Sequence, residues 1–286
     1  MTRTIGIFGL GLIGMALAER LLAAGHTVLG TDVDQGRLDL LESKGGRRAE
    51  PSALWQTDVL LSAVFSTDQL ADIIEAAPDG TGKVLVTMST CDPEQVAALE
   101  GRAAAKGITL VESPISGTSL QVQQGTALLL LAGNDTGLDE FEEFADAIST
   151  QRERVGAIGN GNRTKLAINC VLGLTRAAVA EGLVFAEAVG LDPETFLQTA
   201  LRSAARSDVM AAKGPLMVSR DFTPLGRIAQ SQKDFKLIHD MAGRFGHGGM
   251  PMVNRYLEVM ENAEAAGDSD LDNSAVFRAV LRMAKA

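Results

Sequence analysis

The stretch TIGIFGLGLIG, residues 4–14, decides the fold of the first half of this chain. Its apolar start predicts a β-strand, its glycines predict a tight turn, and the apolar spacing after residue 14 predicts an α-helix. A second apolar run, residues 27–31, then ends at Asp32. Strand, glycine turn, helix, strand and acid, in this order, are typical of a dinucleotide-binding unit.

Each glycine of the turn has a mechanical role in such a unit. Gly9 permits the tight turn, Gly11 lets the backbone approach a pyrophosphate, and Gly14 lets the helix pack closely on the sheet. The helix N-terminus then offers N–H groups and a partial positive charge to the pyrophosphate. A glycine turn that binds nothing is the alternative, and the surrounding strand, helix and acid argue against it. The residues predicted to line the cofactor here are Gly9, Leu10, Gly11, Leu12, Ile13 and Gly14.

Asp32 bears on the choice of cofactor. A carboxylate at the end of the second strand accepts hydrogen bonds from the ribose hydroxyls and repels a 2′-phosphate, so the sequence favours NAD over NADP. Arg37 lies close by and could soften this preference. The alternative is that Asp32 caps a helix, because Asp32 and Asp34 both precede a helical stretch.

Composition limits the class of protein. The chain has 286 residues, of which 46% are apolar, and a net charge of −10, so no basic excess exists to bind nucleic acid. Its two cysteines, Cys91 and Cys170, are too few for a disulfide framework and indicate a reducing compartment. The N-terminus is a core strand, and no apolar run reaches the length of a bilayer. We therefore expect a cytoplasmic protein with no membrane partner and no metal.

The pattern along the chain predicts two domains. Strands expected at 59–65, 83–87, 108–111 and 127–132 alternate with helices, which predicts a doubly wound, mostly parallel Rossmann sheet over residues 1–161. Helical periodicity then continues without a strand, so residues 162–286 are expected to form an all-α domain. The long helix expected at 163–190 would join the two domains.

Oxidation of a hydroxyl at a nicotinamide needs a proton acceptor. His26, His239 and His247 lie in a turn at the wrong sheet edge, in a helix and in a glycine-rich turn, so none is well placed. Lys165 is expected in the first turn of the long helix, where the helix dipole lowers the pKa of an amine. Asn169 shares its face and could hold the reacting oxygen. A solvated lysine near a helix start is the alternative.

Five separated segments resemble the β-hydroxyacid dehydrogenase family, whose members include 3-hydroxyisobutyrate, tartronate semialdehyde and 6-phosphogluconate dehydrogenases. GLGLIG at 9–14 resembles GLGxMG, and SPISGT at 113–118 resembles APVSGG. GNGNRTK at 159–165, with the later Asn169, resembles GxGxxxK. KDF at 233–235 resembles KDL, and GDSD at 267–270 with Ser274 and Ala275 resembles GxGDxDxSA.

The resemblance implies a role for each matching position. Lys165 would be the catalytic acid/base, and Asn169 would hold the substrate hydroxyl. Ser116, Gly117 and Thr118 would bind a substrate carboxylate. The implied cofactor contacts beyond the glycine turn and Asp32 are Val64, Phe65, Thr90 and Lys233.

Purely structural alternatives exist for several of these roles, and two positions depart from the family pattern. Ser116 and Gly117 could form a plain turn, Thr90 could cap a helix, and Lys233 with Asp234 could be a surface pair. Thr118 replaces the second glycine of the family's SGG, and Ile168 stands where relatives often have Asn, which leaves the substrate open.

The resemblance implies an NAD-dependent dehydrogenase that interconverts a small 3-hydroxy carboxylate and its semialdehyde or keto acid. An imine reductase on the same scaffold is one rival, although such relatives generally lack the lysine. A non-catalytic dinucleotide-binding module is the other. The long helix and the apolar helices after it also suggest a homodimer or homotetramer.

Overall fold

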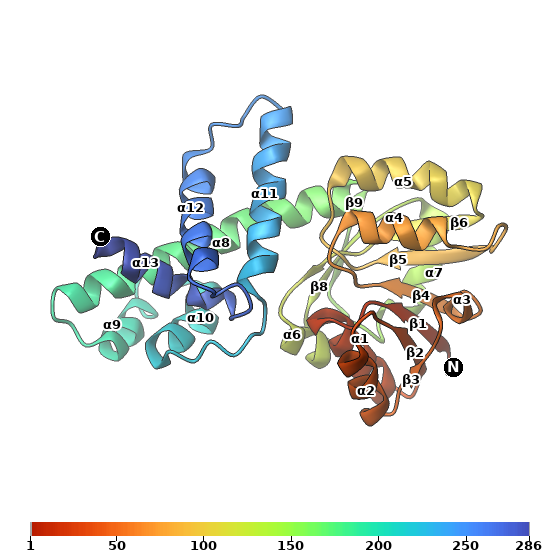
Figure 1. Ribbon diagram of the computed structural model, residues 1–286, viewed down its shortest axis with the longest axis horizontal. Helices are drawn as coiled ribbons and strands as arrows, with labels where there is room; N and C mark the ends of the chain where they lie inside the picture. Colours follow the sequence, from red (N-terminus) through yellow and green to blue (C-terminus); the bar gives the residue numbers. More distant parts are fainter. Residues whose placement is uncertain (1, 286) are drawn as a thin grey trace. The chain divides into compact units, whose positions relative to one another are not determined.

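The computed structural model describes residues 2–285 (Figure 1). The chain divides into two compact units, Met1–Lys165 and Leu166–Ala286. The division falls four residues after the predicted end of the first domain, inside a helix that continues through it.

The first unit contains one mostly parallel sheet. Six parallel strands lie in the order β3-β2-β1-β4-β5-β6, which is the doubly wound order predicted from the alternating pattern. β8 then runs antiparallel to β6, β7 pairs antiparallel with β8, and β9 pairs parallel with β8. The strands are β1 Thr4–Phe8, β2 Thr27–Thr31, β3 Arg47–Arg48, β4 Val59–Ser62, β5 Lys83–Thr87, β6 Ile108–Glu112, β7 Ile115–Ser116, β8 Leu128–Ala132 and β9 Arg152–Gly156.

Helices cover both faces of this sheet. Residues of α1, α2, α6 and α7 join one apolar cluster, and residues of α3, α4 and α5 join another on the opposite face. This two-sided burial explains why the central strands read as continuous apolar runs. The helices are α1 Leu12–Ala23, α2 Gln35–Ser43, α3 Pro51–Leu54, α4 Thr67–Glu75, α5 Pro93–Ala105, α6 Ser119–Gln124 and α7 Asp135–Ala145.

Five short elements did not follow from the sequence pattern: β3, α3, β7, α6 and β9. β3 and β7 have two residues each, too few for any periodicity. β9 reads RERVG and is largely exposed, because it lies outermost beside β8. An edge strand has no second neighbour that would require an apolar sequence.

The second unit is helical, as predicted. Its core contains Phe235 and Tyr256, whose rings meet edge to face with centroids 4.7 Å apart, and Phe277. Gly173 on the long helix faces these rings, and a Cβ there would lie 2.3 Å from Phe235. The helices are α8 Asn160–Ala188, which begins in the first unit, α9 Pro193–Ala200, α10 Asp208–Ser219, α11 Ile228–Arg244, α12 Pro251–Ala265, the 3-10 helix η1 Asn273–Ala275 and α13 Val276–Ala284.

Contrary to expectation, α8 is long and apolar enough to cross a membrane when judged by length and composition. No unbroken apolar run of this length is present in α8, but its few charged residues are spread out, so a window of 18 residues is apolar on average. One third of that window is buried inside the chain, and a core helix of a bundle has the same composition.

Candidate active site

The glycine turn after β1 has the geometry that a pyrophosphate requires. Gly9 has a φ of +87°, which favours glycine. A Cβ on Gly14 would lie 2.0 Å from the carbonyl oxygen of Gly9, so only glycine fits there. A Cβ on Gly11 would meet nothing within 4 Å, and α1 begins beside it without a side-chain cap. The turn therefore leaves room and N–H groups for an anion at the start of α1.

Asp32 connects the end of β2 to this turn. One carboxylate oxygen accepts the N–H of Leu10 at 2.6 Å, and the other accepts the N–H of Asp34 at 2.9 Å. The cap of α2 is Asp34, which accepts the N–H of Gly36 at 2.8 Å. Asp32 is therefore not the helix cap, and each of its oxygens keeps a lone pair for a ribose hydroxyl.

The other predicted cofactor residues follow neighbouring strands. Val64 and Phe65 come after β4, and Thr90 comes after β5, which pairs with β4. Thr90 is buried at 7% exposure, whereas Phe65 is 51% exposed. Carboxyl ends of parallel strands share one edge, which is where ligands bind in such sheets. The fold thus brings these three residues to the same edge as the glycine turn.

The predicted substrate loop follows β6 at the same edge. Gly117 is required, because a Cβ there would lie 2.9 Å from that of Ala127. The Thr118 hydroxyl accepts the N–H of Gln121 at 3.3 Å, and the Thr118 N–H donates to the Gln121 side chain at 2.8 Å. Thr118 therefore caps α6 in a capping box with Gln121, and the spacing Thr-x-x-Gln was the available signal. Ser116 is half-buried at the end of β7.

Lys165 is buried, with 6% of its surface exposed, so it is not the solvated lysine of the alternative interpretation. α8 begins at Asn160, three residues before the predicted start, so Lys165 lies in the second helical turn instead of the first. The effect of the helix dipole weakens beyond the first turn. The dipole argument for this amine is therefore weaker than the sequence indicated, and its burial is the feature that distinguishes Lys165 from a surface lysine.

The second unit contains Asn169 and Lys233. The amide of Asn169 donates to Asp234 at 2.8 Å, and the ammonium of Lys233 lies 3.3 Å from the other oxygen of Asp234. Asp234 is only 5% exposed, so the interpretation of Lys233 and Asp234 as a surface pair is wrong. Asp234 orients both predicted site residues, and its place in KDF was the available signal.

Glu112 is a second residue that sequence reasoning missed. It ends β6 with no exposed surface and accepts hydrogen bonds from the start of α8. Burial raises the pKa of Glu112, while hydrogen bonds from Asn162 and from nearby backbone N–H groups oppose the rise. A lone acid at the end of the apolar strand ITLVE was the available signal.

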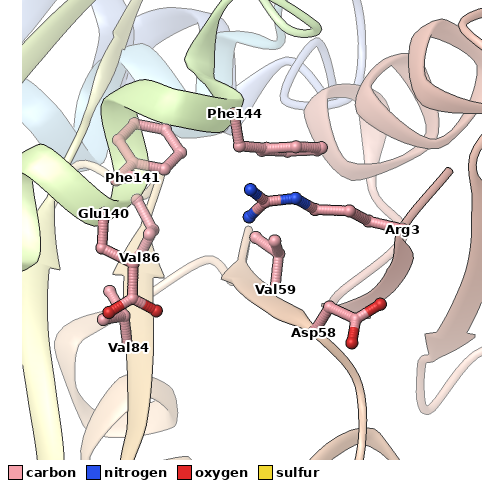
Figure 2. Close-up of a pocket in the computed structure, with 8 residues that line it drawn as sticks. All are labelled: Arg3, Asp58, Val59, Val84, Val86, Glu140, Phe141 and Phe144. Atoms are coloured by element: carbon pink, nitrogen blue, oxygen red, sulfur yellow. The ribbon is translucent and has the colours of Figure 1, made fainter. Parts of the chain in front are cut away.

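The amino-terminal edge of the sheet contains a small cavity (Figure 2). Its volume of about 10 Å³ holds no more than one water molecule. It lies at the edge opposite the glycine turn, so it is not the cofactor site. Within residues 2–285, no group of three or more His, Cys, Asp or Glu is placed to hold a metal. The residues lining the cavity are Arg3, Asp58, Val59, Val84, Val86, Glu140, Phe141 and Phe144.

Comparison with known families divides the chain at residue 159, directly before α8. Residues 4–159 match the NAD-binding domain of 6-phosphogluconate dehydrogenase. Residues 159–280 match the family described as NAD-binding of NADP-dependent 3-hydroxyisobutyrate dehydrogenase.

Individual proteins resemble the chain along nearly all of its length. It is 27% identical to glyoxylate/succinic semialdehyde reductase 2 of Arabidopsis thaliana, over 99% of this chain and 81% of that protein. It is 30% identical to the cytokine-like nuclear factor N-PAC of Danio rerio, over 98% of this chain but 62% of that protein. The solved 3-hydroxyisobutyrate dehydrogenase of Salmonella typhimurium superposes with a TM-score of 0.86 at 22% identity, over 96% of this chain and 99% of the other.

Proposed function

We propose that this chain, which belongs to the β-hydroxyacid dehydrogenase family, uses NAD to interconvert a small 3-hydroxy carboxylate and its semialdehyde or keto acid. An oxidoreductase of hydroxy acids that binds NAD or NADP is what the relatives indicate. The substrate, the preference for NAD and the role of Lys165 are the proposed part.

One observation carries the proposal: Lys165 is a buried amine on α8, one helical turn before Asn169. A lysine with 6% exposure is uncommon unless it has a structural or chemical task. Proton transfer to a hydroxyl oxygen is the task that the family resemblance assigns to this position. A buried side chain is suited to it, because packing holds the amine in one geometry and keeps bulk water away.

The remaining residues would bind and orient the substrate. Ser116 and the N–H of Gly117 would hold the carboxylate, and Thr118 would complete the loop. Asn169, held by Asp234, would position the substrate hydroxyl against Lys165. Lys165 would accept the hydroxyl proton during oxidation and return it during reduction.

The cofactor would supply the hydride acceptor at its nicotinamide. The glycine turn at 9–14 and Asp32 would hold its pyrophosphate and ribose, and Val64, Phe65, Thr90 and Lys233 would contact the rest. Asp32 supports NAD, because a 2′-phosphate would face its carboxylate and that of Asp34. Arg37 lies 3.9 Å from Asp34, so its charge is partly offset there.

A panel of small hydroxy acids tests the proposal. Purified protein is mixed with NAD or NADP and each acid, or with NADH and each semialdehyde or keto acid, and absorbance is followed at about 340 nm. Turnover of a 3-hydroxy carboxylate with NAD is expected. Turnover of imines alone would identify an imine reductase, and dinucleotide binding without any turnover would identify a binding module.

We propose further that copies of the chain associate as a dimer or tetramer. Val171, Phe185 and Val189 of the α8 region are 66%, 67% and 54% exposed, and their spacing places them on one side of the helix, which a second copy would cover. Light scattering should give twice or four times the mass of 30.1 kDa. Phe185→Asp should shift the protein toward monomer, and a monomeric wild-type protein would exclude the association.

A further inference from the structure

A buried carboxylate supports the beginning of the helix that carries Lys165. Glu112 has 0% exposure, and one of its oxygens accepts the backbone N–H of Asn162 at 3.2 Å and its side-chain amide at 2.5 Å. The other oxygen accepts the N–H of Gly159. Glu112 therefore satisfies N–H groups at the start of α8 from a strand that lies about fifty residues earlier in the sequence.

The geometry fixes the protonation state that suits this contact. Both oxygens of Glu112 face N–H donors, so a carboxylic acid proton would point at a donor instead of an acceptor. The positive end of α8 also favours a negative charge here. The carboxylate form is therefore the one that holds the helix.

Asn162 extends this contact to a third segment. It has 0% exposure, and its side-chain oxygen accepts the N–H of Cys91 at 2.7 Å. Cys91 follows Thr90, which is a predicted cofactor contact. Asn162 itself stands three residues before Lys165. The hydrogen-bonded network of Glu112, Asn162 and Cys91 thus joins three segments. These are β6, which precedes the proposed substrate loop, the start of α8, which carries Lys165, and the loop after β5 that contains Thr90.

Close packing leaves these segments little freedom. A Cβ on Gly161 would lie 3.0 Å from the Cβ of Glu112 and 3.2 Å from the ring of Pro114. The first turn of α8 is therefore seated directly on the end of β6. A buried polar network in which each member has its partner defines one arrangement, because every alternative leaves a group unsatisfied.

We propose that Glu112 and Asn162 are positioning residues, which fix the height and rotation of α8 so that the amine of Lys165 meets the cofactor bound beside Thr90. The proposal rests on the proposed function for its catalytic consequence. Its structural part, that the network holds residues 88–92 and 159–165 together, stands without it.

Glu112→Gln is the first test. It replaces one acceptor oxygen by an NH₂ group that faces an N–H donor, so one hydrogen bond is lost and the helix shifts. A displacement of about 1 Å at a reacting group costs roughly 10²-fold, so kcat should fall by about 10- to 100-fold. KM for NAD should change less than about threefold, because the glycine turn is untouched. The matched control is Glu153→Gln, an exposed glutamate on β9.

The reciprocal exchange distinguishes positioning from general support. Asn162→Asp alone sets two carboxylates against each other, so kcat should fall. In the double variant Glu112→Gln with Asn162→Asp, the introduced amide can donate to the introduced carboxylate, which still accepts the N–H of Cys91. The double variant should recover at least about fivefold in kcat over either single variant. Additive losses would overturn the proposal.

Amide hydrogen exchange tests the network without any substrate. Glu112→Gln should speed exchange in residues 88–92 and 159–165, while exchange in β1 should remain as in the wild type. Unchanged exchange in a folded variant would overturn the proposal. If Glu112→Gln does not fold, Asn162→Ala serves instead, because it keeps the acceptor for Gly159. Faster exchange in Glu112→Gln, together with a wild-type protein that is inactive on the whole panel, would confirm the network and refute the proposed function.

Discussion

The two edges of the Rossmann sheet differ in the burial of the carboxylates Glu112 and Asp58. At the carboxyl-terminal edge, Glu112, Asn162 and Thr90 are buried, and hydrogen bonds join the ends of several segments. At the amino-terminal edge, Arg3 pairs with exposed Glu143, and Asp58 accepts the N–H of the adjacent strand. Buried polar groups require a defined geometry, whereas exposed ones tolerate change. The difference agrees with the proposed site at the carboxyl-terminal edge.

The largest expected effect is on kcat, and it should distinguish Lys165 from Lys83. Lys165→Ala should lower kcat by about 10²- to 10⁴-fold, because a positioned acid/base contributes that much, and NAD affinity should change little. The control is Lys83→Ala at the amino-terminal edge, where the ammonium donates to the carbonyl of Thr57 at 2.8 Å. Steady-state kinetics measure both variants. A near-normal kcat for Lys165→Ala would remove this amine from the mechanism.

The next effect concerns the glycine turn. Gly14→Ala should weaken NAD binding by at least about tenfold, because its Cβ would lie 2.0 Å from the Gly9 carbonyl and would force the turn open. Gly101→Ala is the control, since its Cβ would meet nothing within 4 Å. This control should stabilise α5 by about 0.5–1 kcal/mol. Titration followed by NADH fluorescence gives the affinity of each variant. Equal affinities for Gly14→Ala and Gly101→Ala would show that the turn does not bind the cofactor.

The preference for NAD over NADP should depend on Asp32 at the carboxyl-terminal edge and not on Asp58 at the amino-terminal edge. Asp32→Ala should reduce the ratio of kcat/KM for NAD over NADP by roughly tenfold, because a hydrogen bond to a charged group is worth about 1.5–3 kcal/mol. Asp58→Ala removes a similar bond, to the N–H of Thr4 at 2.7 Å, from the other edge. It should leave the ratio unchanged. If both variants give the wild-type ratio, Asp32 serves only to hold the turn.

The smallest effect is on stability and belongs to the amino-terminal edge. Burial and the charge of Arg3 lower the pKa of His26, whose Nδ1 accepts the N–H of Arg3 at 3.1 Å. Folding then favours the neutral ring, so its contribution is present above about pH 6.5 and is lost as the pH falls through the lower folded pKa.

When the pH is lowered from about 7.5 to about 5.5, the Tm of His26→Gln should therefore fall by less than the Tm of the wild type, and kcat should be unchanged. Scanning fluorimetry measures Tm, and His247→Gln, at an exposed position, is the control. An equal loss of Tm in the variant and the wild type would contradict the assignment to His26.

Local pattern was enough to predict the glycine turn and the longer buried strands of the sheet, β1, β2, β4, β5, β6 and β8. The steric demand on Gly14 and the apolar run at 59–62 are set by near neighbours in sequence, so they can be read directly. Glu112 and Asp234 could not be assigned in this way. Their partners, Asn162 and Asn169, lie fifty and sixty-five residues away, and neither spacing repeats with any local period.

The sequence by itself determined the doubly wound sheet, the all-helical second unit and the candidate amine, because periodicity, glycine sterics and family motifs are all local properties. Tertiary structure alone decided that Asp32 holds the glycine turn, through the N–H of Leu10 twenty-two residues earlier in the sequence. It also decided that Glu112 supports the helix of Lys165. A carboxylate or hydroxyl can accept hydrogen bonds from any nearby donor, and only the folded chain determines which donor is near.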